Sequence, residues 1–162
     1  MEIIEAEELR QAMRQWTTGV SIVSAASRGV RHGMTVSSFT SVALDPPTII
    51  ISLERISRTQ SLIKDAGTFG ITFLNSSQQM ISERFAGGES EDSDRFDGLD
   101  TWTLVTGSPL LTGGLAFLDC RLISMQWIGS NTLVIGEVIA ARIGDGGSPL
   151  LYYNRQYRKL QD

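Results

Sequence analysis

The first apolar pattern in the chain has the period of an amphipathic helix. In the segment EAEELRQAMRQW, apolar side chains recur every three or four residues, at Leu9, Ala12, Met13 and Trp16. This spacing places them on one face of a helix, and the early glutamates suit the positive end of the helix dipole. We therefore predict a helix that Gly19 ends.

Most later apolar segments are short and have the pattern of β-strands. In residues 20–26 (VSIVSAA) and 68–74 (TFGITFL), successive side chains alternate between two faces, which predicts strands. Residues 27–33, which follow the first of these strands, predict a turn. Residues 48–54 (TIIISLE) are apolar on both faces, which predicts a central, fully buried strand. From Trp102 onward we expect further short strands within residues 102–106, 114–129 and 131–143.

Residues 33–47, GMTVSSFTSVALDPP, combine a strand-like apolar pattern with an unusual number of hydroxyl groups. We expect a buried strand, because the final DPP excludes helix. The hydroxyls have two explanations. They could simply occupy a solvated outer face, or they could be donors for a flat heteroaromatic ligand such as a flavin, which Gly33 would allow to approach the backbone closely.

Two further helices and one polar loop complete the predicted elements. Residues 57–67 predict a helix capped near Ser57 and stopped by Gly67. Residues 75–86 predict a helix capped by Ser76 or Ser77 that ends at Gly87 and Gly88, with three side chains facing inward: Met80, Ile81 and Phe85. Residues 87–100 are acidic and contain glycine, which is typical of either a mobile surface loop or a lid.

Many short strands with a few modest helices predict a mainly β protein, an antiparallel barrel with helices at its edges. No linker divides the sequence, so we expect a single domain over residues 1–162. A Rossmann fold is disfavoured, because strands and helices do not alternate regularly and no glycine-rich fingerprint follows a strand.

Composition and charge exclude several classes of function. Hydrophobic residues make up 41% and charged residues 20%, as in ordinary globular proteins. The net charge of −4 comes without a basic stripe, which argues against a nucleic-acid partner. The single histidine, His32, excludes multi-histidine metal sites, and we expect no metal. No apolar run is long enough to cross a bilayer and the start is acidic, so a cytoplasmic location is expected.

Cys120 is the only cysteine, so no internal disulfide can form. It lies in the apolar segment LAFLDCRLIS and has no neighbours that would lower its pKa. We expect a buried structural thiol rather than a nucleophile.

Three other places could contribute to a site. SLERISRT brings Ser, Thr and Arg to a strand end and a helix start, where backbone N–H groups favour a phosphate, although a plain helix cap with a solvated arginine explains the same residues. The tyrosine-rich PLLYYNRQYRKL could stack on a ring, fill a barrel end or contact a second subunit. His32 could be a proton donor or simply a turn residue.

The sequence contains an ordered set of motifs: LRQAMRQWTTGVSIVSA, GMTVSSFTSVALDPPTIIISL, SERFAG, DRFDGLDTW, GSPLLTGGLAFLDCRL, IGEV and PLLYYNRQYRKL. From about Leu9 to Leu160, these resemble the flavin reductase-like family, the small NAD(P)H-dependent reductases of two-component flavin monooxygenases. The resemblance implies an FMN-binding split barrel, a homodimer and a separate monooxygenase partner. It also implies FMN, or FAD, as the flavin and NADH or NADPH as the electron donor; no arginine pair for a 2′-phosphate is apparent, which favours NADH.

The resemblance also implies site residues. The stretch along the flavin ring and ribityl chain corresponds to Thr35, Val36, Ser37, Ser38 and Phe39. The end of the next strand and the phosphate-side turn correspond to Ser52, Leu53, Glu54, Ser57, Arg58 and Thr59. A further flavin contact corresponds to Arg84 and Phe85. For the nicotinamide side we expect His32, Asn131, Tyr152 and Arg155.

Asn131 departs from the family pattern, because many relatives carry a histidine at this position before GEV. Asparagine can hydrogen-bond a carboxamide but cannot carry charge near neutral pH. Two alternatives to a flavin reductase therefore remain open at this point. LAFLDCRL and YYNRQYRKL also resemble the branch that reduces cobalt in corrin intermediates, so a cobalt corrinoid could be the acceptor. Alternatively, the protein could bind flavin without catalysis, as a carrier or sensor.

Overall fold

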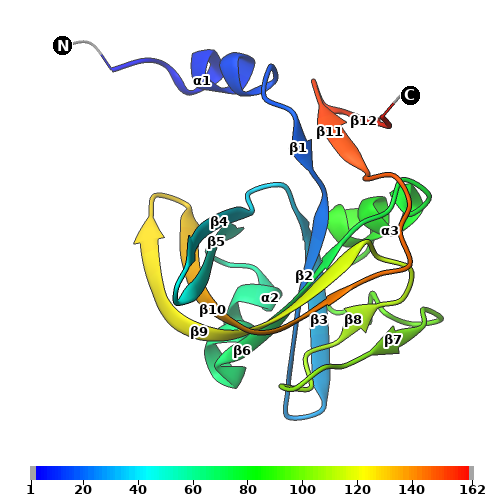
Figure 1. Ribbon diagram of the computed structural model, residues 1–162. Helices are drawn as coiled ribbons and strands as arrows, with labels where there is room; N and C mark the ends of the chain where they lie inside the picture. The colour runs from blue at the N-terminus through cyan, green and yellow to red at the C-terminus, as the bar shows by residue number, and fades with distance from the viewer. Residues whose placement is uncertain (1–2, 161–162) are drawn as a thin grey trace.

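Seven antiparallel strands form one curved sheet in the order β3-β2-β6-β9-β10-β5-β4 (Figure 1). The computed structural model describes residues 3–160. The strands are β2 (Ser21–Ser27), β3 (Val30–Val36), β4 (Thr40–Leu44), β5 (Pro47–Glu54), β6 (Thr68–Phe73), β9 (Ala116–Ile128) and β10 (Asn131–Ile143). In these residues β3 and β4, at the two ends of the order, do not pair with each other. The predicted mainly β, antiparallel class is confirmed, and the unpaired ends are those expected of a split barrel.

Short strands and helices lie around this sheet (Figure 1). The short strands are β1 (Thr18–Gly19), β7 (Thr101–Trp102), β8 (Leu110–Leu111), β11 (Leu151–Tyr153) and β12 (Gln156–Arg158). The helices are α1 (Ala6–Met13), α2 (Arg58–Ala66) and α3 (Gln79–Glu83), and a π-helical turn, η1 (Arg84–Gly88), continues α3. None of these helices is both long and apolar enough for a bilayer crossing within residues 3–160.

The ends of α2 are those that the sequence predicts. The Ser57 side chain accepts a hydrogen bond from the Gln60 N–H, and Gly67 ends the helix with a left-handed φ of 70°. Glycine adopts that conformation at little cost. The buried face of α2 packs against β2, β3 and β6. This fixes the N-terminus of the helix beside β3, where the candidate site lies.

The sheet buries residues in two apolar clusters. The first contains Val23, Ala25, Ile51, Phe69 and Ile71 with Leu62 and Ile63 of α2, and the second contains Val20, Ile22, Leu74, Phe85 and Phe96. Alternate residues of β2 therefore contribute to different clusters, so this strand is buried on both faces. Cys120 belongs to the first cluster, and burial raises the pKa of its thiol to about 12. The predicted burial of this thiol is confirmed.

Several predicted elements differ from those observed. Residues 33–47 are not one buried strand, because β3 ends at Val36 and the mostly exposed strand β4 begins after the short connection of residues 37–39. β5 alternates between buried and partly buried residues instead of being fully buried on both faces, because only one of its faces meets the core. The turn between β2 and β3 is shorter than predicted, and Gly19 lies in β1.

The strand and helix lengths also required correction. β9 and β10 are long, pairing over 13-residue strands, rather than short. The N-cap of α3 is Gln78, not Ser76 or Ser77, and it makes no side-chain capping bond. Met80 is exposed, whereas Phe85 is buried as predicted and Ile81 is partly buried. α1 forms within the predicted segment but ends at Met13, before Trp16 and well before Gly19, and it has no buried residue.

Candidate functional site

Two cavities adjoin on the side of the sheet formed by β2 and β3. The larger cavity has a volume of about 880 Å³ and the smaller about 450 Å³. Val20, Ser37 and Tyr152 line both cavities, so these residues form a shared wall. Both volumes lie in the range of sites for small molecules and cofactors, roughly 300–1,000 Å³.

The smaller cavity has a polar end and an apolar side. β3 contributes His32, Met34 and Thr35, and the connection from β5 to α2 contributes Glu54 and Ser57. Phe85 of η1 and Tyr157 of β12 lie against it, and Glu91 and Arg95 reach it from the acidic loop of residues 89–100. The polar residues gather at the N-terminus of α2, where N–H groups and the helix dipole favour an anion.

The larger cavity is mainly apolar with cations at its rim. Trp16, Phe39 and Phe73 contribute aromatic surface. Arg10, Arg14 and Arg155 line it as well, and guanidinium groups suit the bidentate recognition of phosphate oxygens. Such a cavity can hold an aromatic ring and an anionic tail together.

Two of the five hydroxyls of residues 33–47, those of Thr35 and Ser38, already have partners in the protein. Thr35 Oγ1 donates to the Ser82 carbonyl at 2.6 Å. Ser38 Oγ donates to the Ser52 carbonyl at 2.9 Å and accepts from the Ser52 N–H at 3.0 Å, which ties the crossing between β3 and β4 to β5. The hydroxyl of Ser37 makes no hydrogen bond within residues 3–160 and lies on the shared wall. Ser37 is thus the one free hydroxyl among these three residues.

The two apolar neighbours of these hydroxyls lie in different places. Val36 is buried in the first cluster and lines neither cavity. Phe39 lines the larger cavity and packs edge-to-face on Phe73 with a centroid distance of 4.9 Å. Of the predicted flavin stretch, the structure therefore brings Thr35 to the smaller cavity, Ser38 and Phe39 to the larger one, and Ser37 to both.

The residues predicted to contact flavin at the end of the next strand, and those of the phosphate-side turn, divide in the same way. Glu54 and Ser57 line the smaller cavity, whereas Leu53 is buried in the core and Ser52 lines neither cavity. Ser57 Oγ is engaged as the helix cap, since it donates to the Glu54 carbonyl and accepts from Gln60 N–H. What remains available here is the end of the α2 backbone.

The other residues of this turn and of η1 mostly act behind the cavity wall. Thr59 is buried and its Oγ1 lies 2.8 Å from His32 Nδ1. Phe85 lines the smaller cavity, but Arg84 does not, because its guanidinium pairs with Glu89 at 3.0 Å. Arg58 lines neither cavity and instead contacts the acidic loop, because its Nη1 donates to the Glu91 carbonyl at 2.7 Å and lies 3.9 Å from Asp92 Oδ1.

Gly33 does not leave room for a ligand, contrary to our expectation. A Cβ on Gly33 would lie 3.0 Å from Phe85 Cε1 and from the Val23 carbonyl oxygen, and 3.1 Å from Phe96 Cζ. The rings of two phenylalanines therefore occupy the space above this glycine. Gly33 serves the packing of the acidic loop on β3.

The predicted nicotinamide-side residues are not brought together. Tyr152 lies on the shared wall and Arg155 lines the larger cavity, whereas His32 lines the smaller one. Asn131 lines neither, and its amide donates to Ser52 Oγ at 3.0 Å.

His32 is a buried, neutral residue of β3 and not a turn residue. Burial, followed by the nearby Arg95 guanidinium, lowers its pKa from 6.5 to about 4. Its Nε2 atom is buried without a hydrogen-bond partner in residues 3–160 and lies 3.9 Å from Glu91 Oε2. A neutral imidazole nitrogen that faces the polar end of a cavity can hydrogen-bond a ligand. Because the pKa of His32 is about 4, the imidazolium form that would act as a general acid is not populated at neutral pH.

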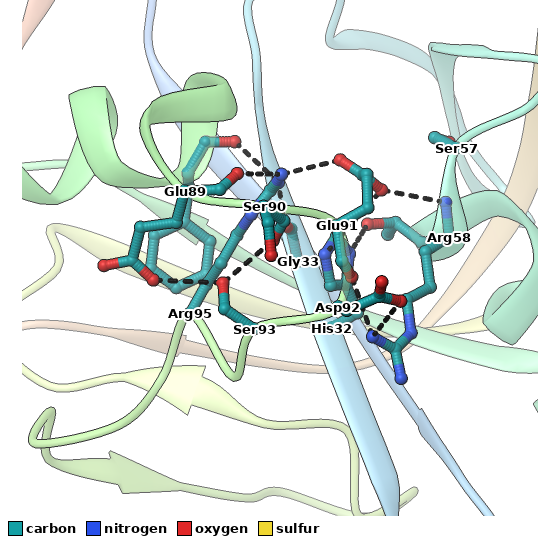
Figure 2. Close-up of polar contacts among 12 residues, drawn as sticks. His32, Gly33, Ser57, Arg58, Glu89, Ser90, Glu91, Asp92, Ser93 and Arg95 are labelled. Carbon is teal, nitrogen blue, oxygen red and sulfur yellow. Dashed lines mark hydrogen bonds and ion pairs between the residues drawn. The ribbon is translucent and has the colours of Figure 1, made fainter.

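The sequence reasoning missed the role of the acidic loop. Arg95 and Phe96 are almost completely buried, so the loop is anchored to β3 and η1. Arg95 Nη1 donates to the carbonyls of Gly33 at 3.0 Å and Phe85 at 3.2 Å (Figure 2). The motif DRFDG contains the signal, since an arginine beside a phenylalanine in an otherwise polar loop is unusual, but nothing in the sequence says what they contact.

The site suits a flavin in its chemistry. The orphaned His32 nitrogen, the α2 N-terminus and the Arg95 guanidinium are donors for an anion. The free Ser37 hydroxyl and the aromatic surface around the shared wall suit a flat ring. Two ligands placed in adjoining cavities would meet at this wall, which is the geometry that direct transfer between them requires.

Comparison with known proteins gives a consistent result. The family model described as "Flavin reductase like domain" matches residues 13–161. An NADH-dependent flavin reductase of a Rhodococcus species is 36% identical over 157 residues, covering 94% of this chain and 85% of that protein. The reductase subunit HsaB of a flavin-dependent monooxygenase from Rhodococcus jostii is 33% identical and covers 99% and 80%, respectively.

A solved structure shares the fold as well. The flavin reductase of styrene monooxygenase from Pseudomonas putida S12 superposes with a TM-score of 0.85 at 33% sequence identity, covering 95% of this chain and 97% of that one.

Proposed function

The chain belongs to the flavin reductase-like family, and on that premise we propose that it is an NAD(P)H-dependent flavin reductase acting on FMN or FAD. NADH is the favoured donor, in keeping with the named activity of the Rhodococcus relative. Bound flavin supplies the acceptor for a hydride, and the protein supplies orientation and a dry environment. We propose that one reductase domain spans the chain.

The observation that carries this proposal is the wall shared by the two cavities. We place the flavin in the smaller cavity, with its phosphate end toward the N-terminus of α2 and its ring toward Ser37 and Tyr152. We place the nicotinamide nucleotide in the larger cavity, where Arg14 and Arg155 face its pyrophosphate. This arrangement needs no acid or base from the protein, which fits a neutral His32 and an uncharged Asn131.

The test is a rate measurement on the purified chain. We expect NADH absorbance at 340 nm to fall only when FMN or FAD is present, and flavin absorbance near 450 nm to bleach under anaerobic conditions. NADH oxidation that flavin does not accelerate would contradict the proposal. Tight flavin retention without turnover would favour a carrier, and cob(II)alamin reduction exceeding flavin reduction would favour a corrinoid acceptor.

We also propose that the protein delivers reduced flavin to a separate monooxygenase. The support is that two of the relatives are reductase components of monooxygenase systems by name. Coupled hydroxylation by a flavin-dependent monooxygenase, measured with this chain as the sole source of reduced flavin, tests the proposal.

We propose that the active form is a homodimer. Three apolar residues of the first segment, Leu9, Met13 and Trp16, are all exposed although they share one helical period. The edge strand β4 exposes Val42 and Leu44, and the end of β9 exposes Trp127 and Ile128. Apolar surface spread over three elements is typical of an interface between subunits. Light scattering should give the mass of two chains; a monomer that turns over NADH at full rate would contradict the proposal.

A further inference from the structure

Glu91 lies over the N-terminus of α2 and is held there by several contacts (Figure 2). Its Oε2 accepts from the Arg58 N–H at 3.3 Å, and its Oε1 accepts from Arg95 Nη2 at 2.6 Å. Its own backbone carbonyl accepts from Arg58 Nη1 at 2.7 Å. The carboxylate thus takes the donors that an anionic ligand at this helix end would use.

These donors form a built anion subsite. The helix offers a first-turn N–H, and the Arg95 side chain is only 2% exposed. His32 is a further, independent sign of a ligand, because its side chain is 1% exposed and its unpartnered Nε2 points at Glu91 Oε2 from 3.9 Å. A neutral imidazole can donate to a phosphate oxygen as well as it can to a carboxylate oxygen. In the tautomer in which His32 Nδ1 accepts from the Thr59 hydroxyl, Nε2 carries the proton and the subsite has one more donor than the carboxylate satisfies.

Glu91 is the solvent-exposed member of this arrangement. Its side chain is 57% exposed, whereas the guanidinium that binds it is fixed from below by the carbonyls of Gly33 and Phe85. Rotation of the Glu91 side chain into solvent would leave Arg95, His32 and the α2 N–H in place. A phosphate monoester presents three strong acceptor oxygens and up to two charges, so it can replace one carboxylate on the same donors.

We propose that Glu91 is a specificity-determining residue of the flavin site: its carboxylate occupies the anion subsite, and the phosphate of FMN binds by displacing it. This inference rests on the proposed function. The measured affinity for a phosphorylated flavin is the intrinsic affinity multiplied by the fraction of molecules in which Glu91 has left. Riboflavin lacks the phosphate and does not compete with Glu91. The carboxylate therefore reduces the ratio of FMN affinity to riboflavin affinity, and it weakens FMN binding so that FMN can dissociate and exchange.

The test compares the dissociation constants of FMN and riboflavin, measured by quenching of flavin fluorescence. In Glu91→Gln the charge is lost and the shape is kept, and in Glu91→Ala the competitor is removed. We expect both variants to bind FMN about tenfold more tightly than the unaltered chain and to bind riboflavin within about twofold of it. Inorganic phosphate should weaken FMN binding to Glu91→Ala and leave riboflavin binding unchanged.

Asp97→Asn is the matched control, because it removes one negative charge from the same loop at an exposed residue whose carboxylate makes no hydrogen bond or ion pair within residues 3–160. An equal gain in FMN affinity in Asp97→Asn would mean that general charge repulsion, not displacement, explains the effect, and would overturn the inference. So would an unchanged ratio of the two dissociation constants, or weaker FMN binding, in both Glu91 variants. If neither flavin binds to any of these proteins, the proposed function fails together with the inference; if both flavins bind with an unchanged ratio, only the inference fails.

Discussion

Two regions of the molecule differ from their sequences in opposite ways: the hydroxyl-rich segment of residues 33–47 contributes fewer ligand donors than its sequence suggests, and the acidic loop of residues 89–100 contributes more to the site. The hydroxyl-rich segment has the sequence of a row of ligand donors, yet Thr35 and Ser38 donate their hydroxyls to carbonyls of the protein itself. The acidic loop has the composition of a solvated surface segment, yet it buries Arg95 and Phe96 and supplies Glu91 to the site. The type of a side chain determines which hydrogen bonds it can make. Its neighbours in the fold determine whether its donors and acceptors are still available to a ligand.

The largest expected effect comes from removing the anchor of the acidic loop. Arg95→Ala leaves the two buried carbonyls of Gly33 and Phe85 without their arginine donor, and Glu91 Oε1 also loses the donor that Arg95 supplies. A buried acceptor left without its donor costs about 1–3 kcal/mol, so for two carbonyls we expect a loss of roughly 2–6 kcal/mol in urea unfolding. Arg31→Ala is the control, because its pair with Asp94 of the same loop is exposed and costs about 1 kcal/mol or less. Equal losses in the two variants would show that the loop is not anchored by Arg95.

Stability should depend on pH through His32, the residue of β3 that faces the acidic loop. His32 faces Arg95, Glu91, Arg58 and Asp94, and its pKa in the folded protein is about 4 against an ordinary value of 6.5. Between these two values the unfolded chain binds more protons than the folded one, so stability falls as the pH falls. The free energy of unfolding has its full value, as far as His32 determines it, above pH 6.5. It falls as the pH is lowered to about 4, by at most about 3 kcal/mol.

Urea unfolding at a series of pH values between 7.5 and 4 measures this effect. His32→Asn should reduce the slope of stability against pH in that window, because the titrating group is gone. A slope that His32→Asn leaves unaltered would assign the acid sensitivity to carboxylates elsewhere in the protein.

A third, smaller effect tests the direct packing of one region on the other. In Gly33→Ala the new methyl group would press on the rings of Phe85 and Phe96 and on the Val23 carbonyl. Overpacking of this kind costs about 1–3 kcal/mol, and we expect faster hydrogen exchange in residues 89–100. Gly19→Ala should change stability by less than about 0.5 kcal/mol, because no atom lies within 4 Å of its added Cβ. If Gly33→Ala is as stable as Gly19→Ala, the space above Gly33 is open to a ligand after all.

The smallest effect separates two neighbouring serines. Ser38→Ala loses both hydrogen bonds to the Ser52 backbone and should cost about 1 kcal/mol in unfolding free energy. Ser37→Ala should change stability by less than about 0.5 kcal/mol but raise the KM for flavin, because its hydroxyl lies free on the shared wall. The reverse pattern would exchange the structural and ligand-binding roles of the two residues.

Local sequence signals predict the elements that depend on local interactions. The helix from Ser57 to Gly67 forms with its predicted ends, because a side-chain cap and a left-handed glycine need no distant partner. The strand at 48–54 lies where the sequence predicts, but its predicted burial is wrong, because burial depends on which strands and helices lie on each face. The inward position predicted for Met80 is wrong for the same reason: its helical period is right, but that side of α3 meets solvent.

The sequence by itself determined the antiparallel β class, the buried cysteine, the absence of a basic stripe along the chain and, through its ordered motifs, the family. These depend on composition, on periods of a few residues and on motifs that can be compared directly. Only the tertiary structure decided which hydroxyls are free, that Arg95 is a buried anchor, and that Glu91 covers the N-terminus of α2. Those facts depend on contacts between residues 14 to 62 positions apart. The contribution of a polar side chain depends on the partner that the fold brings to it, and no local sequence pattern encodes that partner.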